Sequence, residues 1–274
     1  MKKITYLVVL LIIFACQKEE NPNAIPAYLK IDSITLEKND TTTTTTTNIT
    51  DAWVYINDQL QGVYELPAKF PVLENDYQTL RIKAGIKSNG IASSRIAYPF
   101  YASFIDTVIF TPNQTITVNP IVSYLDSIYF WLEAFEFEAQ LRLDTDSFFS
   151  IDNINGIDNK YGKITLQDSM LLSEITTFEL PHLPQVGAPV FLELDYKCNT
   201  EFLVGVYINF PQSVLQKDLL WINPKDDWNK IYINLTSTIS EGVGAESFKV
   251  FIGMKRDFSL DKNEVYFDNL KVVY

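Results

Sequence analysis

The chain has 274 residues, of which 47% are hydrophobic and 14% aromatic, and its formal net charge is −12 at pH 7. This length and apolar content are enough to bury a core in one large or two modest domains. The excess of 34 acidic over 22 basic side chains excludes nucleic acid as an expected partner, because binding there depends on basic groups that neutralise phosphates. Neutral glycans, proteins and cations remain as expected partners.

The first 15 residues have the pattern of a cleaved signal peptide. Lys2 and Lys3 precede an almost wholly apolar run, residues 4–15, which ends on the small Ala15. As a helix this run is roughly 18 Å long, too short for a bilayer core of about 30 Å. We therefore expect residues 1–15 to be removed, and the loss of two lysines leaves 20 basic against 34 acidic side chains.

The end of this signal, Ile13-Phe14-Ala15-Cys16, resembles the lipobox of bacterial lipoproteins. The resemblance implies that Cys16 becomes the first residue of the mature chain and carries several acyl chains, which anchor a protein more durably than one chain does. Lys18, Glu19 and Glu20 then resemble the export signal of Bacteroidetes surface lipoproteins, which implies an outer-membrane protein facing the extracellular side. The alternative is an ordinary charged tether. Either way, residues 16–27 are expected to be a lipid-anchored tether.

Residues 28–125 show short alternating segments separated by Pro, Asn and Gly, which predict a β-sandwich. In the segment 77–86, for example, Leu80, Ile82 and Ala84 share one side. The run from Val54 to Gly85 resembles small sandwiches of the PEGA and carboxypeptidase-regulatory type, and such modules are spacers or interaction domains.

The Thr-rich stretch 40–48 is expected to be an exposed loop in this sandwich, because a uniform threonine run cannot choose a buried face. Asp40-Thr41-Thr42 also resembles the acceptor motif of Bacteroidetes O-glycosylation. That resemblance implies a glycan on Thr41.

Residues 129–274 contain further strand segments with short loops, which predict a jelly roll of two packed sheets. The complete prediction is an all-β chain, with two β-sandwich domains behind a lipoprotein signal peptide. The last segment, 264–273, resembles the closing strand of galactose-binding-like and carbohydrate-binding jelly rolls. Its apolar phase slips at Asp268-Asn269, which predicts a β-bulge there.

Calcium is the ion that this resemblance implies. Related jelly rolls often hold a structural Ca²⁺ between an acid of the first strand and an Asp of the last, and the matching residues here are Glu136 and Asp268. Oxygen ligands suit Ca²⁺. The alternative is that both are ordinary edge and bulge residues, and no organic cofactor is expected.

Alternation in the second domain also predicts residues that face away from the core. Exposed aromatic side chains beside amides and lysines could stack on and hydrogen-bond a sugar, or anchor a protein interface. Single outward aromatics are, however, normal in strands. The predicted ligand face consists of Tyr207, Asn209, Lys230, Tyr232, Lys249 and Phe251, with Trp221 and Trp228 flanking a loop as a second candidate.

Catalysis is not expected from this composition. The only histidine, His182, lies between prolines, and Cys198 alternates in phase with apolar residues as a core side chain would. Acidic residues are abundant but none has a recognisable catalytic setting. We predict a non-catalytic surface lipoprotein that acts as a protein-interaction or accessory subunit of an outer-membrane assembly. The alternatives are glycan binding in support of polysaccharide capture, and adhesion to other surfaces.

Overall fold

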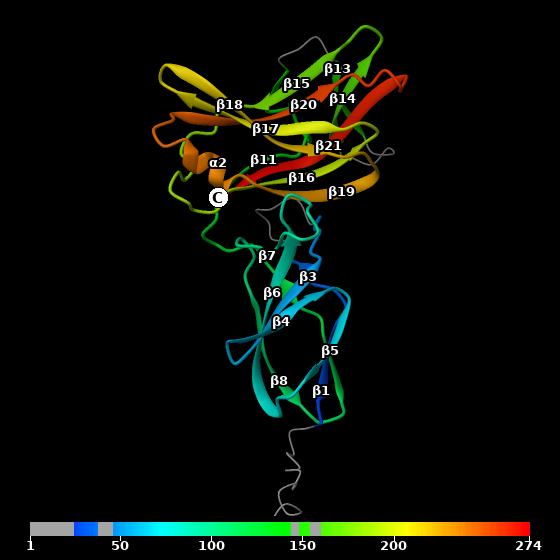
Figure 1. Cartoon of the computed structure of the whole chain (residues 1–274), viewed down its shortest axis with the longest axis vertical. Coiled ribbons are helices and arrows are strands. Elements are labelled where there is room, and N and C mark those ends of the chain that lie inside the picture. Colours follow the sequence, from blue (N-terminus) through cyan, green and yellow to red (C-terminus); the bar gives the residue numbers. More distant parts are fainter. Residues whose placement is uncertain (1–24, 38–45, 144–147, 154–159) are drawn as a thin grey trace, which may run out of the picture.

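The computed structural model describes residues 25–37, 46–143, 148–153 and 160–274. They form two β-sheet bodies stacked along the long axis of the molecule (Figure 1). Among the described residues, no helix has both the length and the apolar content needed to cross a bilayer. Several predicted features lie outside the described residues: the signal peptide 1–15, Cys16, Lys18, Glu19, Glu20 and Thr41.

The N-terminal body is a β-sandwich, in agreement with the predicted fold class. One sheet has the order β4-β3-β6-β7 with β8 also paired to β6, and the other strands form β5-β1-β9 and β10-β2. Leu80, Ile82 and Ala84, which were predicted to share a side, are all buried in the core. The strands are β1 (Ala27–Ile31), β2 (Thr35–Leu36), β3 (Asp51–Ile56), β4 (Gln59–Glu65), β5 (Ala68–Val72), β6 (Asp76–Lys87), β7 (Arg95–Ala97), β8 (Phe104–Phe110), β9 (Thr115–Val118) and β10 (Ile121–Val122).

The C-terminal body is a jelly roll, as predicted. What we call its lower sheet has the order β13-β14-β21-β16-β19 with β11 also paired to β21, and what we call its upper sheet has the order β12-β15-β20-β17-β18. The elements are β11 (Phe130–Glu133), β12 (Leu141–Leu143), β13 (Phe148–Asn153), β14 (Lys160–Gln167), β15 (Leu172–Thr177), β16 (Phe191–Cys198), β17 (Phe202–Phe210), β18 (Ser213–Ile222), β19 (Lys225–Asn234), α2 (Thr236–Glu241), β20 (Ser247–Lys255) and β21 (Lys262–Val273).

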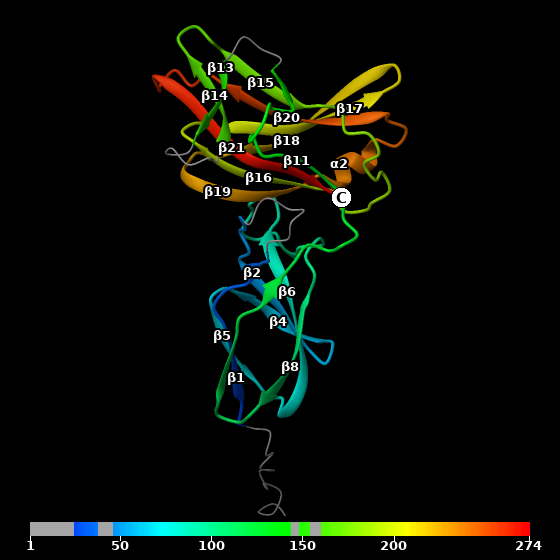
Figure 2. The same ribbon diagram turned by 180° about the vertical axis from the view of Figure 1, so that it is seen from behind.

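The alternation of each strand decides which side chains fill the jelly-roll core. Leu192 and Leu194 of the lower sheet meet Val204 and Val206 of the upper sheet in one buried cluster. The intervening residues of both sheets therefore point away from this core. The lower sheet turns its outer face toward the N-terminal sandwich, whereas the upper sheet lies on the far side of the jelly roll (Figures 1 and 2).

The bulge predicted in the last strand is confirmed. Glu193 pairs with Lys271 but Asp195 pairs with Asp268, so the register shifts by one residue between them. Asn269 takes a left-handed backbone conformation with φ of 50° at this place. The bulge lets the strand keep apolar side chains in the core on both sides of the shift, while Asp268 and Lys271 reach the outer face.

The outer face of the lower sheet rests on the N-terminal sandwich through a buried polar network. Both oxygens of Glu193 accept hydrogen bonds from the hydroxyl of Tyr124, at 2.9 and 2.8 Å, and Tyr98 donates to Oε1 at 2.7 Å. Lys230 Nζ lies 3.2 Å from Glu193 Oε2. Burial alone would raise the pKa of Glu193, but the charges of Lys230 and Lys271 and the two tyrosine donors hold that pKa below its ordinary value.

Hydrogen bonds to backbone carbonyls of β19 continue this interface. The N–H of Asn89 donates to the carbonyl of Tyr232 at 2.8 Å, and Asn48 Nδ2 donates to the carbonyl of Lys230 at 2.8 Å. Thr46 is exposed, as expected for the Thr-rich loop, but its hydroxyl donates to Asp195 at 2.6 Å. The described end of that loop is therefore attached to the jelly roll.

Candidate functional site

A groove crosses the outer face of the upper sheet. In register, Glu174 of β15 pairs with Gly253 of β20, Gly253 pairs with Leu203 of β17, and Leu203 pairs with Trp221 of β18. These residues form one row of outward positions, since paired residues in a sheet share a face. The groove has a volume of about 330 Å³, at the lower end of the range of ~300–1,000 Å³ of small-molecule sites.

Gly253 is the reason that this face is hollow. A Cβ added there would approach no atom closer than 4.0 Å outside its chain neighbours. In the next row, by contrast, the ring of Phe251 covers Gly205 and fills the space above it. The floor of the groove is therefore the backbone at Gly253 beside the buried Leu203, and its walls rise from β15 and β18.

The walls combine one aromatic ring with polar groups. Trp221 is 41% exposed, and Lys255 Nζ lies 5.6 Å from the centre of its ring. Glu174 Oε1 accepts a hydrogen bond from the hydroxyl of Tyr207 at 2.7 Å, which orients the carboxylate. Gln216 and Asp218 also line the groove, and the Gln216 amide donates to Asp218 at 3.0 Å.

This arrangement can hold a hydroxyl-rich ligand with a flat apolar face. An indole ring offers a large rigid surface for such a face. Carboxylates accept hydrogen bonds from hydroxyl groups, while the Gln216 amide and the Lys255 ammonium donate them. Charges of both signs are present in the walls, so the groove does not by itself demand a charged ligand.

The predicted ligand face is divided by the structure. Trp221 lines the groove, whereas Tyr207, Asn209, Lys249 and Phe251 occupy further rows of the same sheet face. Phe251 is only 1% exposed because the ring of Tyr207 packs on it at 4.9 Å between centroids. Its predicted role as an exposed aromatic is therefore wrong.

The exposed positions predicted for Lys230 and Tyr232 are also wrong. They lie on the outer face of the lower sheet, where the N-terminal sandwich leaves them 5% and 1% exposed. Alternation identified the correct side of β19 but could not show that the N-terminal sandwich covers it. Trp228 is 39% exposed at the edge of this same face, in a cleft described below.

Several groove residues were missed as site residues, namely Glu174, Gln216, Asp218 and Gly253. One signal was available in the sequence. Gly253 interrupts a run of large strand residues, FKVFIGMK, and a glycine inside a strand marks a bulge or a close approach of another group.

The predicted calcium ligands lie in different surroundings. The resemblance placed Glu136 in the first strand, but β11 ends at Glu133 and Glu136 follows in a bend. Its carboxylate accepts the N–H of Lys160 there at 3.3 Å. Burial raises the pKa of Asp268 to about 7, and the charges of Asp195 and Glu136 add to this rise. The described residues contain no group of three or more His, Cys, Asp or Glu side chains arranged to hold a metal. Calcium binding stays a prediction.

Neither His182 nor Cys198 lines the groove. His182 is exposed in the loop after β15. Cys198 is 2% exposed, its thiol donates weakly to the carbonyl of Asn223 at 3.7 Å, and burial raises its pKa. A raised pKa disfavours the thiolate that a nucleophile needs.

Comparison with known proteins gives structural similarities only. No protein-family model and no curated protein matches the chain. One similar solved structure contains the CBM22-1–GH10 modules of a Clostridium thermocellum endo-1,4-β-D-xylanase complexed with xylohexaose. It has 9% identity and a TM-score of 0.38 over 52% of this chain. The chain covers 26% of the length of that protein.

Two further similarities are to isolated modules. A structure described as a carbohydrate-binding module of the β-sandwich superfamily with promiscuous specificity has 12% identity and a TM-score of 0.40, over 81% of this chain and 83% of that one. The family 11 module of Clostridium thermocellum, complexed with a β-1,3-1,4-mixed-linked tetrasaccharide, has 12% identity and a TM-score of 0.37, over 52% of this chain and 94% of that one. Similarity at this level supports no statement about what this chain binds.

Proposed function

We propose that the protein binds a carbohydrate in the groove of the upper sheet, without catalysing a reaction on it. The observation that carries this proposal is the row Glu174–Gly253–Leu203–Trp221, in which an exposed indole and a carboxylate stand on either side of an open backbone floor. This geometry favours the glycan-binding alternative over the protein-interaction role that the sequence suggested.

The experiment compares the full chain with Gly253→Leu and Trp221→Ala on an array of neutral poly- and oligosaccharides. A leucine at position 253 projects into open space and fills the groove, so it should abolish glycan retention while the fold stays intact. Loss of the Trp221 ring should weaken binding by about tenfold or more. Val214→Ala is the matched control, because Val214 is exposed on the same strand outside the groove. Absence of any glycan ligand, or equal binding by Gly253→Leu, would refute the proposal.

The proposed setting of this groove is the cell surface. The lipobox and the export signal support an acylated Cys16 in the outer membrane, facing outward. The groove lies on the outer face of the upper sheet. That sheet is on the side of the jelly roll away from the N-terminal sandwich, and β1 begins at the opposite end of that sandwich (Figures 1 and 2). A tether at the N-terminus would thus present the groove outward. Protease treatment of whole cells should remove the protein, and Cys16→Ser should release it from membranes.

Protein interaction remains the second candidate function. The outer face of the sheet that contains β6 and β8 carries Tyr77, Ile105 and Ile109, which are 72%, 64% and 48% exposed, and such an apolar surface is typical of interaction sites. Affinity purification of the lipidated protein from mildly solubilised membranes tests this role. A stoichiometric partner that is lost in Tyr77→Asp would establish it.

A further inference from the structure

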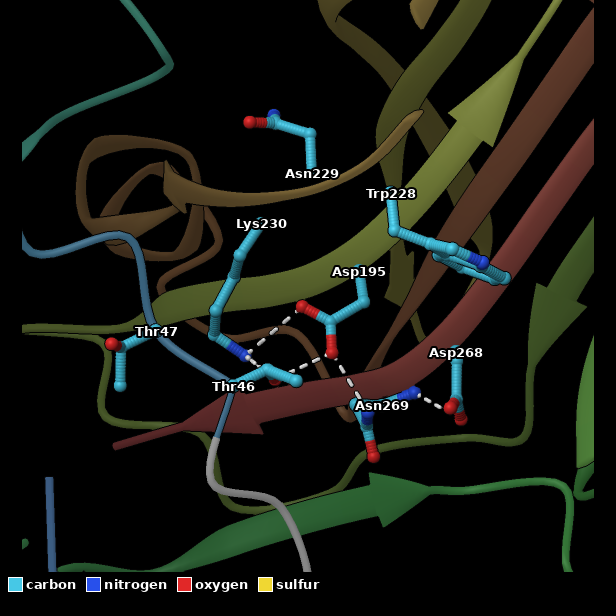
Figure 3. A pocket seen from close by; sticks show the side chains of 8 residues that line it. All are labelled: Thr46, Thr47, Asp195, Trp228, Asn229, Lys230, Asp268 and Asn269. Atoms are coloured by element: carbon cyan, nitrogen blue, oxygen red, sulfur yellow. Dashed lines mark hydrogen bonds and ion pairs between the residues drawn. The ribbon is translucent and has the colours of Figure 1, made fainter. Parts of the chain in front are cut away.

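A second hollow of about 310 Å³ lies between the outer face of the lower sheet and the end of the Thr-rich loop (Figure 3). We call it the interdomain cleft. The lining residues come from β16, β19, β21 and the N-terminal sandwich: Asp195, Trp228, Asn229, Lys230, Asp268, Asn269, Thr46 and Thr47. It therefore exists only in the assembled pair of domains, and it is separate from the groove of the upper sheet.

Asp195 contacts three neighbouring side chains. Its Oδ2 accepts hydrogen bonds from Thr46 Oγ1 at 2.6 Å and from Asn269 Nδ2 at 2.7 Å, and its Oδ1 lies 3.6 Å from Lys230 Nζ. Figure 3 shows these contacts converging on this one carboxylate. Asp195 thus shapes the wall of the cleft and leaves little capacity for a ligand.

Asp268 is the carboxylate in the cleft that can still accept further hydrogen bonds. Its side chain lines the cleft and is only 5% exposed, yet among the described residues its one hydrogen bond comes from the backbone N–H of Asn269, at 2.7 Å. A carboxylate has about four acceptor positions, and a buried charge without a partner of opposite sign is costly. No lysine or arginine of the described chain forms an ion pair with it.

The nearby lysines contact groups other than Asp268. Lys230 Nζ is shared between Glu193 and Asp195, at 3.2 and 3.6 Å. Lys271 Nζ lies 3.2 Å from the hydroxyl of Tyr124, on the side of the interface network, and Lys197 Nζ lies over the ring of Tyr266. Carboxylates therefore outnumber the available cations around the cleft, and a ligand that carries a positive charge would compensate Asp268.

Trp228 supplies an apolar wall to the same cleft. Its indole is 39% exposed and is held edge-on by Tyr161, at 5.9 Å between ring centres. An exposed indole face attracts both cations and flat apolar surfaces. Thr47 and the amide of Asn229 add hydrogen-bonding groups for hydroxyls.

We propose that the interdomain cleft binds an amino sugar, with the ammonium group of the ligand on Asp268 and a face of the sugar ring against Trp228. A neutral sugar could hydrogen-bond Asp268 but would bring no positive charge to it. This site does not depend on the groove, so either can fail without the other.

The test is calorimetric titration of the full chain with glucosamine at pH 7.5, with glucose and N-acetylglucosamine as neutral counterparts. Glucosamine should bind at least about tenfold more tightly than either, because hydrogen bonds to charged groups are stronger than neutral ones. Asp268→Asn keeps an acceptor for the Asn269 N–H but removes the charge, so it should reduce affinity about tenfold or more. Asp227→Asn removes a neighbouring exposed charge outside the cleft and should leave affinity unchanged. Trp228→Leu should weaken binding of the sugar ring.

Gly253→Leu separates the two sites, because it should block the groove and leave glucosamine binding intact. Absence of saturable glucosamine binding would overturn the proposal, as would equal affinity for glucose or an unchanged affinity in Asp268→Asn. Measurement of the melting temperature with added calcium chloride is a further test. A calcium-induced rise in melting temperature that Asp268→Asn abolishes, without glucosamine binding, would assign the cleft to a metal ion and overturn the amino-sugar proposal.

Discussion

Glu193 on β16 and Lys230 on β19 form an ion pair, with 3.2 Å between Oε2 and Nζ, in which both side chains are almost completely buried. Both residues lie on the outer face of the lower sheet. The N-terminal sandwich covers both, and its tyrosines Tyr98 and Tyr124 donate to the carboxylate. The pair therefore couples the stability of the lower sheet to the attachment of the two domains.

Glu193→Gln tests this coupling. It removes the nearer of the two carboxylates that pair with the buried Lys230, since Asp195 lies at 3.6 Å. Removal of one member of a buried pair costs about 3–5 kcal/mol. We expect a loss of that size in the free energy of unfolding, measured in urea. Glu241→Gln is the control, because its pair with Lys217 is exposed and should contribute at most about 1 kcal/mol. Equal losses in the two variants would contradict the role of Glu193.

Lys271 gives the interface a dependence on pH. Burial lowers its pKa from 10.5 to about 8, so between these values the folded protein binds fewer protons than the unfolded chain. The free energy of unfolding should consequently rise with pH across this window, with a slope of up to about 1.4 kcal/mol per pH unit.

In Lys271→Met the free energy of unfolding should not show this rise with pH. Comparison with the wild-type protein cancels the titration of other groups. Measurements at pH 7.5–9.5 avoid the region near pH 10, where unfolding would ionise Tyr98 and Tyr101, whose pKa values burial raises in the folded state. Parallel curves for the two proteins would show that Lys271 is not responsible.

Gly205 and Gly253 differ sharply in the space available to a side chain. In Gly205→Ala the new methyl would overlap the ring of Phe251 and lie 2.5 Å from the backbone oxygen of Lys217. We expect a loss of at least about 2 kcal/mol there. Gly253→Ala meets open space and should leave stability unchanged or raise it by up to about 1 kcal/mol. Thermal unfolding of both variants measures the difference, and similar melting temperatures would contradict the described groove floor.

Cys198 should be unreactive in the folded protein. It is buried, and its raised pKa reduces the thiolate fraction that attacks disulfide reagents. In the Cys16→Ser chain it is the only thiol, so labelling with a chromogenic disulfide reports on it alone. Labelling should be slow without denaturant and fast in urea. Fast labelling of the native chain would contradict a core position.

The resemblance-based predictions outside the described residues remain to be measured. An intact mass that contains the acyl groups but no glycan would exclude modification of Thr41, while a mass without acyl groups would exclude the lipobox at Cys16.

The strands were predictable because alternation reports on a local constraint, the separation of a buried from an open side. It located Leu80 and Ile82 in one core and identified the correct sides of β17, β19 and β20 in the other. The slip at Asp268-Asn269 likewise revealed a bulge, since an extra residue changes the phase within a single strand. The helix α2 was not predicted, because its short segment TSTISE carries little periodic signal.

The sequence by itself determined the all-β class, the two-sandwich organisation, the outward phase of the strands and the expectation of a lipid anchor. Only the tertiary structure decided which outward faces meet solvent. Tyr232 and Lys230 were indistinguishable in pattern from truly exposed residues, and they are buried because the N-terminal sandwich covers them. The groove and the interdomain cleft arise in the same way, from residues far apart in the chain that strand pairing and domain contact bring together. Alternation within one strand carries no information about either.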